Sequence, residues 1–146
     1  MKVVLDTNVL VSGLHTPGGR CSEVLRLVRK RLLAPCVDAR ILAEYDEVLH
    51  RLDRLIPPDE ADEMCRVLQE ISTVVDPLPL ARKLPHLTDV PFLEVAKSSG
   101  ATLVTGNLRH FPRRQRAGVR VLSPGELLDL LGQEGHGSMC TKEKPG

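Results

Sequence analysis

The sequence begins with MKVVLDTNVLVSGL (residues 1–14), in which a short apolar run ends on an aspartate. Residues 2–5 (KVVL) predict a strand that is covered on both faces, because a half-exposed strand would alternate apolar and polar residues. Asp6, Thr7 and Asn8 follow this strand, and apolar spacing then resumes. A carboxylate at the end of a buried strand raises the question of which other acids the fold brings to the same place.

Strands and helices alternate along the rest of the chain. Apolar runs predict strands at 32–37, 72–75, 102–105 and 119–122, and helical spacing predicts helices at about 24–32, 41–52, 58–71, 89–99 and 126–131. Gly100 is a helix stop signal, and Ser123, Pro124 and Glu126 form a capping box at the start of the last helix. This alternation predicts an α/β fold, namely a three-layer α/β/α sandwich with a central parallel sheet.

The length and composition are those of a single folded domain. With 146 residues the chain is long enough for one compact core, which we expect to span residues 1–131. After Leu131 the periodicity disappears, and residues 132–146 are expected to be a disordered tail. The first apolar stretch is interrupted by Asp6 and Asn8, so it lacks the unbroken core of a signal peptide or a membrane span. We therefore expect a cytoplasmic protein.

The cysteines and histidines show no metal-binding pattern along the sequence. The four cysteines form no C-x-x-C pair, and none has a histidine at a zinc-ligand spacing. The five histidines are scattered without a paired spacing. We therefore expect buried, reduced thiols and assign no metal role to the histidines.

Charge is distributed unevenly, although the net charge is only +1. Residues 36–63 contain nine acidic and three basic residues. The segment 95–125 contains no acid and six basic residues, which are Lys97, Arg109, Arg113, Arg114, Arg116 and Arg120. This arginine cluster is either a phosphate-binding surface or a solvated basic loop. With only one tyrosine, two phenylalanines and no tryptophan, base stacking on aromatic side chains is scarcely available.

Polar side chains at two predicted strand ends indicate a site at one edge of the sheet. In open parallel sheets, ligands bind beyond the carboxyl ends of the strands. Asp6 lies at the end of the first strand, and Thr105 and Asn107 lie at the end of the strand 102–105. Asp89 begins the helix that leads into that strand. Each residue could also be only a helix cap or part of a turn, but their joint placement favours a shared site.

The helix 41–52 offers a further acid, and periodicity does not identify which one. Glu44 and Asp46 flank its apolar stripe on opposite sides, and Glu47 points away from it. Either flanking acid could face the site, and an acid at such a boundary is also commonly just solvated. The sequence leaves this choice open.

Four stretches, in this order, resemble the PIN-domain family. They are VVLDTNVLVSG, ILAEYDEVL, TDVPFLEVAKSSGATLVTGN and RVLSPGELL, and they extend over residues 1 to about 131. More narrowly, the chain resembles bacterial PIN proteins of the VapC type, which are described as toxin components of toxin–antitoxin pairs. The D-T-N motif alone is only moderately specific, so the ordered series carries the resemblance.

The resemblance implies a PIN-like fold and a metal-dependent endoribonuclease, in which water activated by Mg²⁺ or Mn²⁺ hydrolyses RNA phosphodiesters. It assigns catalysis and metal binding to Asp6, Glu44 and Asp89, with support from Asn8, Thr105 and Asn107. The basic residues Arg109, Arg113, Arg114 and Arg116 would then hold the RNA backbone. A cognate antitoxin and a second copy of the chain in a homodimer are the implied protein partners, with no membrane association.

The residue types suit this chemistry, with one departure. Mg²⁺ prefers oxygen ligands, and crowded carboxylates bind protons more tightly when no cation is present. The fourth acid that is frequent in the family falls at Asn107, which can offer an amide oxygen but no charge. Asn107 could therefore also indicate a weakened or inactive RNA-binding or regulatory protein. Glu94 is either a partial substitute for the missing acid or a structural residue.

A different class of enzyme would transfer a phosphoryl group to Asp6. Haloacid-dehalogenase-like phosphatases would want a second aspartate where Asn8 stands, and receiver domains would want an acid pair with a phosphoacceptor on the third strand. Because the predicted strand 72–75 offers only Asp76 in a proline-containing loop, this alternative is the weaker one.

Overall fold

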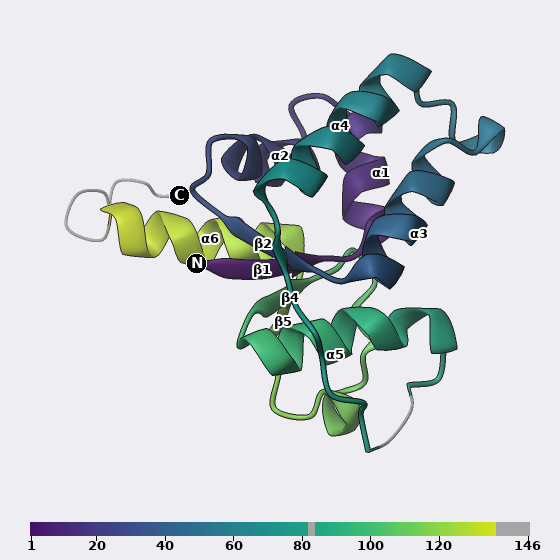
Figure 1. Cartoon of the computed structure of the whole chain (residues 1–146). Coiled ribbons are helices and arrows are strands. Elements are labelled where there is room, and N and C mark those ends of the chain that lie inside the picture. Colours follow the sequence, from purple (N-terminus) through teal and green to yellow (C-terminus); the bar gives the residue numbers. More distant parts are fainter. Residues whose placement is uncertain (82–83, 137–146) are drawn as a thin grey trace.

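A parallel five-stranded sheet forms the centre of the computed structural model, which describes residues 1–81 and 84–136. Its strands are β1 (Lys2–Leu5), β2 (Ala34–Val37), β3 (Thr73–Val74), β4 (Thr102–Val104) and β5 (Val121–Leu122). The strand order is β3-β2-β1-β4-β5, and every pairing is parallel (Figure 1). The five strands predicted from apolar runs are confirmed, and all but β1 are shorter than predicted.

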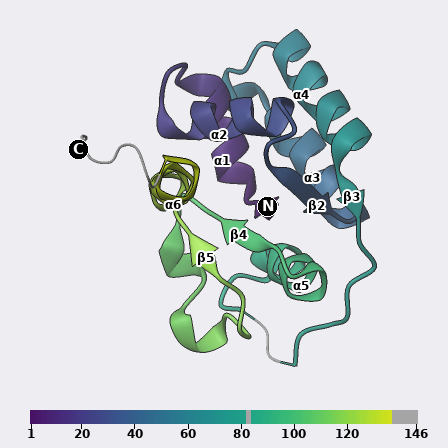
Figure 2. The same cartoon turned by 90° about the vertical axis from the view of Figure 1, so that its left-hand side faces the viewer.

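Helices cover both faces of the sheet. They are α1 (Thr7–His15), α2 (Arg20–Arg29), α3 (Ala39–Leu49), α4 (Pro58–Ile71), α5 (Val90–Ser99) and α6 (Pro124–His136). Helix α5 lies on one face and contacts β1, β2 and β4, whereas α1, α2, α4 and α6 lie on the other (Figures 1 and 2). The predicted three-layer α/β/α sandwich is confirmed. Among the described residues, no helix has the length and apolar character needed to cross a membrane.

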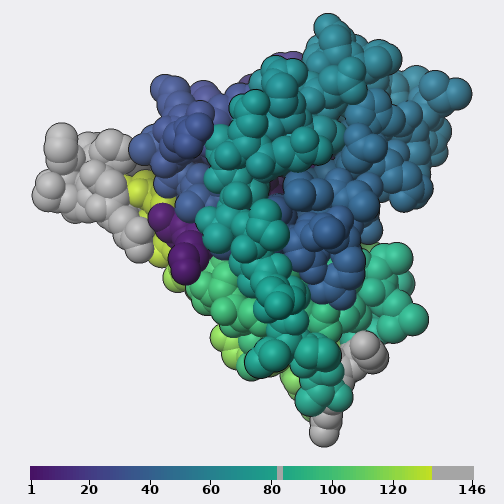
Figure 3. All heavy atoms as spheres, in the orientation of Figure 1, coloured from purple at the N-terminus to yellow at the C-terminus, as the bar shows by residue number. Residues whose placement is uncertain are grey.

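The connections place several short 3₁₀ helices beside these layers. They are η1 (Leu52–Arg54), η2 (Leu87–Asp89), η3 (Leu108–His110) and η4 (Arg113–Gln115). The segment that follows α4 runs across the outside of the molecule toward α5 (Figure 3). In this segment the Leu80 amide donates a hydrogen bond to Glu94 Oε2 on α5, at 2.9 Å.

Helix boundaries follow local capping more closely than apolar spacing. The Asp38 carboxylate accepts a hydrogen bond from the Ile41 amide, so α3 begins at Ala39, two residues before the start predicted from apolar spacing. The capping box before α6 is present, with Ser123 and Glu126 bonded to each other's amides. Helix α6 continues to His136, past the boundary expected at Leu131. The remainder of the expected tail, residues 137–146, lies outside the described residues.

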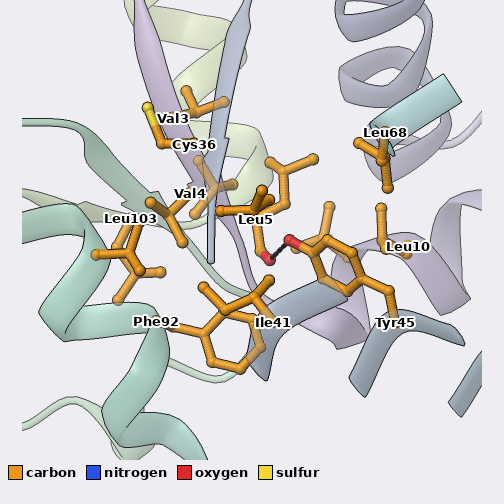
Figure 4. Close-up of a cluster of buried hydrophobic side chains, with 14 of the residues drawn as sticks. Val3, Val4, Leu5, Leu10, Cys36, Ile41, Tyr45, Leu68, Phe92 and Leu103 are labelled. Atoms are coloured by element: carbon orange, nitrogen blue, oxygen red, sulfur yellow. Dashed lines mark hydrogen bonds between the residues drawn. The ribbon is translucent and has the colours of Figure 1, made fainter. Parts of the chain in front are cut away.

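A buried tyrosine joins α3 to the end of the first strand (Figure 4). The Tyr45 hydroxyl donates a 2.5 Å hydrogen bond to the Leu5 carbonyl, and its ring lies 6.3 Å from that of Phe92. Tyr45 is only 2% exposed, so its hydroxyl needs a partner within the core. Because Leu5 immediately precedes Asp6, this contact positions the residues of α3 next to the end of β1.

The strand order reverses direction between β1 and β4. The chain adds β2 and β3 on one side of β1, and it then adds β4 and β5 on the other. The Asp6 amide donates to the Val104 carbonyl at 2.9 Å, which joins the ends of these two strands. Open parallel sheets have a ligand-binding crevice at such a reversal, so the fold places its natural binding site directly beside Asp6.

Candidate active site

A cavity of about 470 Å³ opens at this edge of the sheet. It is lined by Asp6 and Asn8 from the β1–α1 junction, Glu44 from α3, and Asp89 from the end of η2. The structure thus brings together the three acids that the family resemblance assigned to one site. The described residues Asn107, Arg109, Arg113, Arg114 and Arg116 do not line the cavity.

Asp6 is the most buried acid of the cavity, with 5% exposure. It occupies the N-cap position of α1 without capping it, and its Oδ2 instead accepts a 2.7 Å hydrogen bond from the Thr105 hydroxyl. Burial raises the pKa of Asp6 to about 6, against the lowering effect of the Thr105 hydrogen bond. The negative charges of Asp89 and Glu44 add to this rise in the pKa of Asp6.

Two polar residues hold Asp6 in place from the neighbouring strand and helix. The backbone N–H of Asn107 donates to the Thr105 hydroxyl oxygen at 3.0 Å, which leaves the hydroxyl proton for Asp6. Asn8 accepts a hydrogen bond from the Gly106 amide at 3.0 Å, so its own NH₂ group faces Asp6 Oδ2 at 3.4 Å. Asn8 therefore acts as a donor to the carboxylate, and its carbonyl oxygen is already used by the end of β4.

Helix α3 brings two acids to the cavity, Glu44 and Glu47, but not Asp46. Glu47 was not expected there, and its Oε2 accepts a 2.8 Å hydrogen bond from Arg51 Nη2. Glu44 is half-buried, and its Oε2 accepts a 2.6 Å hydrogen bond from the Thr7 hydroxyl. Asp46 is exposed and lies toward α4, near Asp62 and Cys65. The apolar stripe of α3 left both Glu44 and Asp46 open, whereas the Tyr45 contact with Leu5 orients the helix so that Glu44 meets the β1–α1 junction.

Asp89 is a buried carboxylate with one incompletely satisfied oxygen. It has an exposure of 6% and does not cap α5, although it occupies the N-cap position. Its Oδ2 lies 2.9 Å from His110 Nδ1 but receives no well-directed hydrogen bond. Burial raises the pKa of Asp89, and the adjacent His110 and His86 oppose that rise. The two histidine rings stack with their centroids 4.1 Å apart.

Three basic residues that sequence reasoning had not assigned line the cavity, namely Arg51, Arg54 and His110. In the helix predicted at 41–52, Arg51 follows Glu44 by seven residues and so shares its face. This signal could have identified Arg51, although α3 ends at Leu49 in the structure. The predicted RNA-binding residues Arg109, Arg113 and Arg114 are exposed on η3 and η4. Arg116 is half-buried, and its Nε donates to the Phe111 carbonyl at 2.8 Å.

Glu94 has a structural environment away from the cavity. It is 4% exposed, its Oε2 accepts from the Leu80 amide, and its Oε1 lies 2.9 Å from Arg40 Nη1. Arg40 also pairs with Asp38 at 2.7 Å. The open choice for Glu94 is thereby resolved in favour of the structural residue, because both of its oxygens are engaged elsewhere.

The donor set of the cavity fits a hard divalent cation. Four carboxylates line the cavity, of which Glu47 is paired with Arg51 and the other three offer oxygen ligands. No thiol among the described residues lines it. Burial raises the pKa values of both Asp6 and Asp89, because their ionised forms lose water. A bound cation would stabilise the ionised carboxylates and replace their protons. The buried Asp89 Oδ2, which lacks a well-directed donor, is available to a metal ion.

The parallel α/β/α fold and the acids clustered at its strand-order reversal define the class of protein to which the chain can be compared. Residues 2–109 match the sequence profile of the PIN domain, and the chain belongs to the PIN-domain family. No protein of curated function matches the chain significantly.

Solved structures share this fold at low sequence identity. The chain is similar to VapBC2 from Rickettsia felis, solved bound to a DNA fragment from the promoter of its own system, with a TM-score of 0.58 and 16% identity. It is also similar to FitAcB from Neisseria gonorrhoeae, with a TM-score of 0.53 and 19% identity. Each match covers 84% of this chain and 98% of the other. A domain of unknown function from Methanocaldococcus jannaschii aligns with a TM-score of 0.50 and 17% identity, covering 82% of this chain and 88% of that domain.

Proposed function

We propose that the protein is a Mg²⁺- or Mn²⁺-dependent endoribonuclease that acts as the toxin of a toxin–antitoxin pair. The observation that carries this proposal is the convergence of Asp6, Glu44 and Asp89 on one cavity at the strand-order reversal of a PIN fold. Nucleases of this kind need concentrated negative charge to retain a hard cation beside a phosphodiester, and this cavity provides it.

The residues around the cavity have distinct tasks in the proposed reaction. Asp6, Glu44 and Asp89 hold the cation, which when bound neutralises phosphate charge and lowers the pKa of water. Thr105 and Asn8 fix the orientation of the Asp6 carboxylate through their hydrogen bonds. Ligand orientation by such neighbours strongly affects metal affinity.

Basic residues account for binding of the RNA backbone. Arg51 and Arg54 are at the cavity itself and attract the phosphate that is cleaved. The exposed Arg109, Arg113 and Arg114 extend a positive surface from η3 to η4, where flanking phosphates would bind. In this proposal the phosphate that is cleaved binds in the cavity, and the neighbouring phosphates of the RNA bind along η3 and η4.

The structural neighbours support a protein partner for this chain. VapBC2 and FitAcB are toxin–antitoxin assemblies, which supports a cognate antitoxin for this chain. We extend the proposal to a homodimer in the cytoplasm, and size-exclusion chromatography with light scattering tests the oligomeric state.

Cleavage of labelled RNA, with single-stranded DNA of the same sequence as a comparison, tests the activity. The purified protein should cleave RNA with Mg²⁺ or Mn²⁺ and lose this activity in EDTA. Asp89→Asn should also lose it, whereas Glu70→Gln, which changes an exposed acid of α4, should retain it. Equal cleavage by Asp89→Asn, or cleavage that survives EDTA, would remove the metal-dependent mechanism.

A second candidate function is a PIN-fold RNA-binding or regulatory protein without catalysis. It is favoured by Asn107, which replaces the frequent fourth acid and does not line the cavity. In this case RNA would bind without being cleaved at any Mn²⁺ concentration. Asn107→Asp would then be the informative variant, since a gain of cleavage would attribute the inactivity to the missing charge.

A further inference from the structure

A second cluster of metal-ligand side chains lies between α3 and α4, outside the acidic cavity. Asp46 of α3, His50 at the C-cap of α3 and Cys65 of α4 each offer one ligand atom, and these atoms lie within 4.8 Å of one another. Asp46 and His50 are four residues apart and therefore share one helix face. Packing of α3 against α4 brings Cys65 to that face.

The His50 ring is held on both of its nitrogens. Nδ1 lies 2.8 Å from the Asp46 carbonyl oxygen and 3.5 Å from Asp46 Oδ1, and Nε2 lies 2.6 Å from Asp62 Oδ1. A histidine that ligates a metal commonly donates its other ring nitrogen to a carboxylate or a carbonyl, which fixes the ring. An ion that binds one His50 nitrogen displaces the acceptor on that nitrogen, and the contact on the other nitrogen keeps the ring fixed beside Cys65.

The cluster combines a protected thiol with an open rim. Cys65 is 8% exposed, whereas the side chains of Asp46 and Asp62 are 67% and 68% exposed. An ion can therefore enter from solvent past the two carboxylates and reach the thiol at the base. Exposed carboxylates can also change rotamer at little cost, which allows the ligand atoms to close on an ion.

The donor types select a borderline cation. One imidazole nitrogen, one sulfur and carboxylate oxygens form a typical set for Zn²⁺, whereas Mg²⁺ prefers oxygen alone. Zinc bonds of about 2.0–2.3 Å in a tetrahedron separate the ligand atoms by about 3.3–3.8 Å. The observed 4.8 Å envelope exceeds this by an amount that rotation of the exposed Asp46 side chain can remove.

We propose that Asp46, His50 and Cys65 form a Zn²⁺ site that fastens α3 to α4, with Asp62 or water completing the coordination. The site is separate from the acidic cavity, because it uses the face of α3 that points away from Glu44. It is independent of nuclease activity, since a structural zinc site contributes to folding rather than to the reaction.

Zinc binding at this cluster releases protons from the ligand side chains. Burial, with the charges of Asp46 and Asp62, raises the pKa of Cys65 to about 11, so the free thiol is protonated at neutral pH. When Zn²⁺ binds, two protons are released to solvent, one from the Cys65 thiol and one from the His50 nitrogen that becomes a ligand, because both ring nitrogens face acceptors. The thiolate and the neutral imidazole are then the ligands, with no change in oxidation state. The same negative charges that retain the protons attract the cation.

Cobalt is the probe for this site, because Co²⁺ bound to a thiolate has a charge-transfer absorption band that oxygen-only sites lack. A Cys140→Ser background removes the one cysteine that lies outside the described residues. In this background, we expect the band to saturate at one equivalent of Co²⁺ and to disappear when Zn²⁺ is added. Cys65→Ser and His50→Ala should abolish it, and the matched Cys21→Ser should retain it.

Two further measurements separate this site from the nuclease and from folding defects. Asp6→Asn, which disables the acidic cavity, should leave the cobalt band unchanged. Zn²⁺ should raise the unfolding temperature of the parent and of Cys21→Ser but leave that of His50→Ala unchanged. Absence of the band in the parent, or its persistence in a Cys65→Ser protein with native circular dichroism, would overturn the proposal. If Cys65→Ser does not fold, persistence of the band in His50→Ala would do so.

Discussion

Helix α3 presents two acids to two different environments. Glu44 faces a cavity that contains carboxylates and hydroxyls, whereas Asp46, two residues later, faces a histidine and a thiol on the side of α4. Residues two apart on a helix differ by about 200° in direction, so one helix can serve both places. The environment of an acid on this helix is therefore decided by the orientation of the helix and not by the residue type.

The two places also differ in how much they cost the fold. In the acidic cavity, Asp6 and Asp89 are 5% and 6% exposed, so their ionised forms lose water. At the α3–α4 cluster, both carboxylates remain largely solvated, and only the thiol is buried. In the cavity, a cation should therefore mainly order the buried carboxylates. At the α3–α4 cluster, it should mainly join the two helices.

The largest effect should come from Glu44→Gln, which changes the acidic cavity but not the α3–α4 cluster. Loss of a ligand charge should reduce Mg²⁺-dependent RNA cleavage by more than about 100-fold, because changes in second-shell residues already cost 10–100-fold. The cobalt band of the α3–α4 cluster should persist in this variant. Asp46→Asn should instead weaken the cobalt band, so parallel cleavage and absorbance titrations compare the two faces directly. Loss of both signals in Glu44→Gln would show that the two sites are not independent.

The stability of the metal-free protein should depend on pH through Asp6. The folded chain holds the proton more tightly, since the pKa rises from 3.8 to about 6. Stability from this residue is fully present below pH 3.8 and is lost as the pH rises through about 6. The shift corresponds to roughly 2–3 kcal/mol in the free energy of unfolding.

Urea denaturation in EDTA at about pH 4 and about pH 7.5 measures this contribution of Asp6. Asp6→Asn should remove that part of the pH dependence and stabilise the metal-free protein at neutral pH, because the amide carries no buried charge. The α3–α4 cluster, with its solvated acids, should contribute less. An unchanged pH profile in Asp6→Asn would contradict the raised pKa.

Thr105→Val should weaken the metal affinity of the cavity by about 10–100-fold, because it removes the donor that orients Asp6. The conservative variant Thr105→Ser should restore most of the affinity. Calorimetric Mn²⁺ titration measures the change, and the cobalt band serves as the reference for the unaffected cluster. Equal Mn²⁺ affinity in Thr105→Val would mean that packing alone orients the carboxylate.

Tyr45→Phe should produce the smallest effect and extend it to both sites. The variant leaves the buried Leu5 carbonyl without its donor, which costs about 1–2 kcal/mol in the free energy of unfolding. Because Tyr45 positions the whole of α3, Mn²⁺ affinity and cobalt affinity should both fall slightly. Chemical denaturation and the two metal titrations measure these changes. A defect confined to one site would show that α3 is held by other contacts.

Much of the fold was predictable because it depends on local pattern. Residues 3–5 are apolar without alternation, which specifies a strand covered on both faces, and the structure buries Val3, Val4 and Leu5 fully. The position of Asp6 directly after that strand placed it at the carboxyl edge of a parallel sheet. Ser123 and Glu126 likewise predicted the start of α6, since a capping box is a local interaction.

The sequence by itself therefore determined the alternating elements, the acids at strand ends and, through the ordered motifs, the family. Only the tertiary structure showed that Glu44, and not Asp46, meets the β1–α1 junction. It also showed that Glu94 pairs with Arg40 and that His50 lies beside Cys65 of α4. Periodicity reports which face of a helix is apolar, but the packing of two helices decides which side chains meet across them. That packing depends on contacts distant in sequence, such as the Tyr45 hydroxyl on the Leu5 carbonyl.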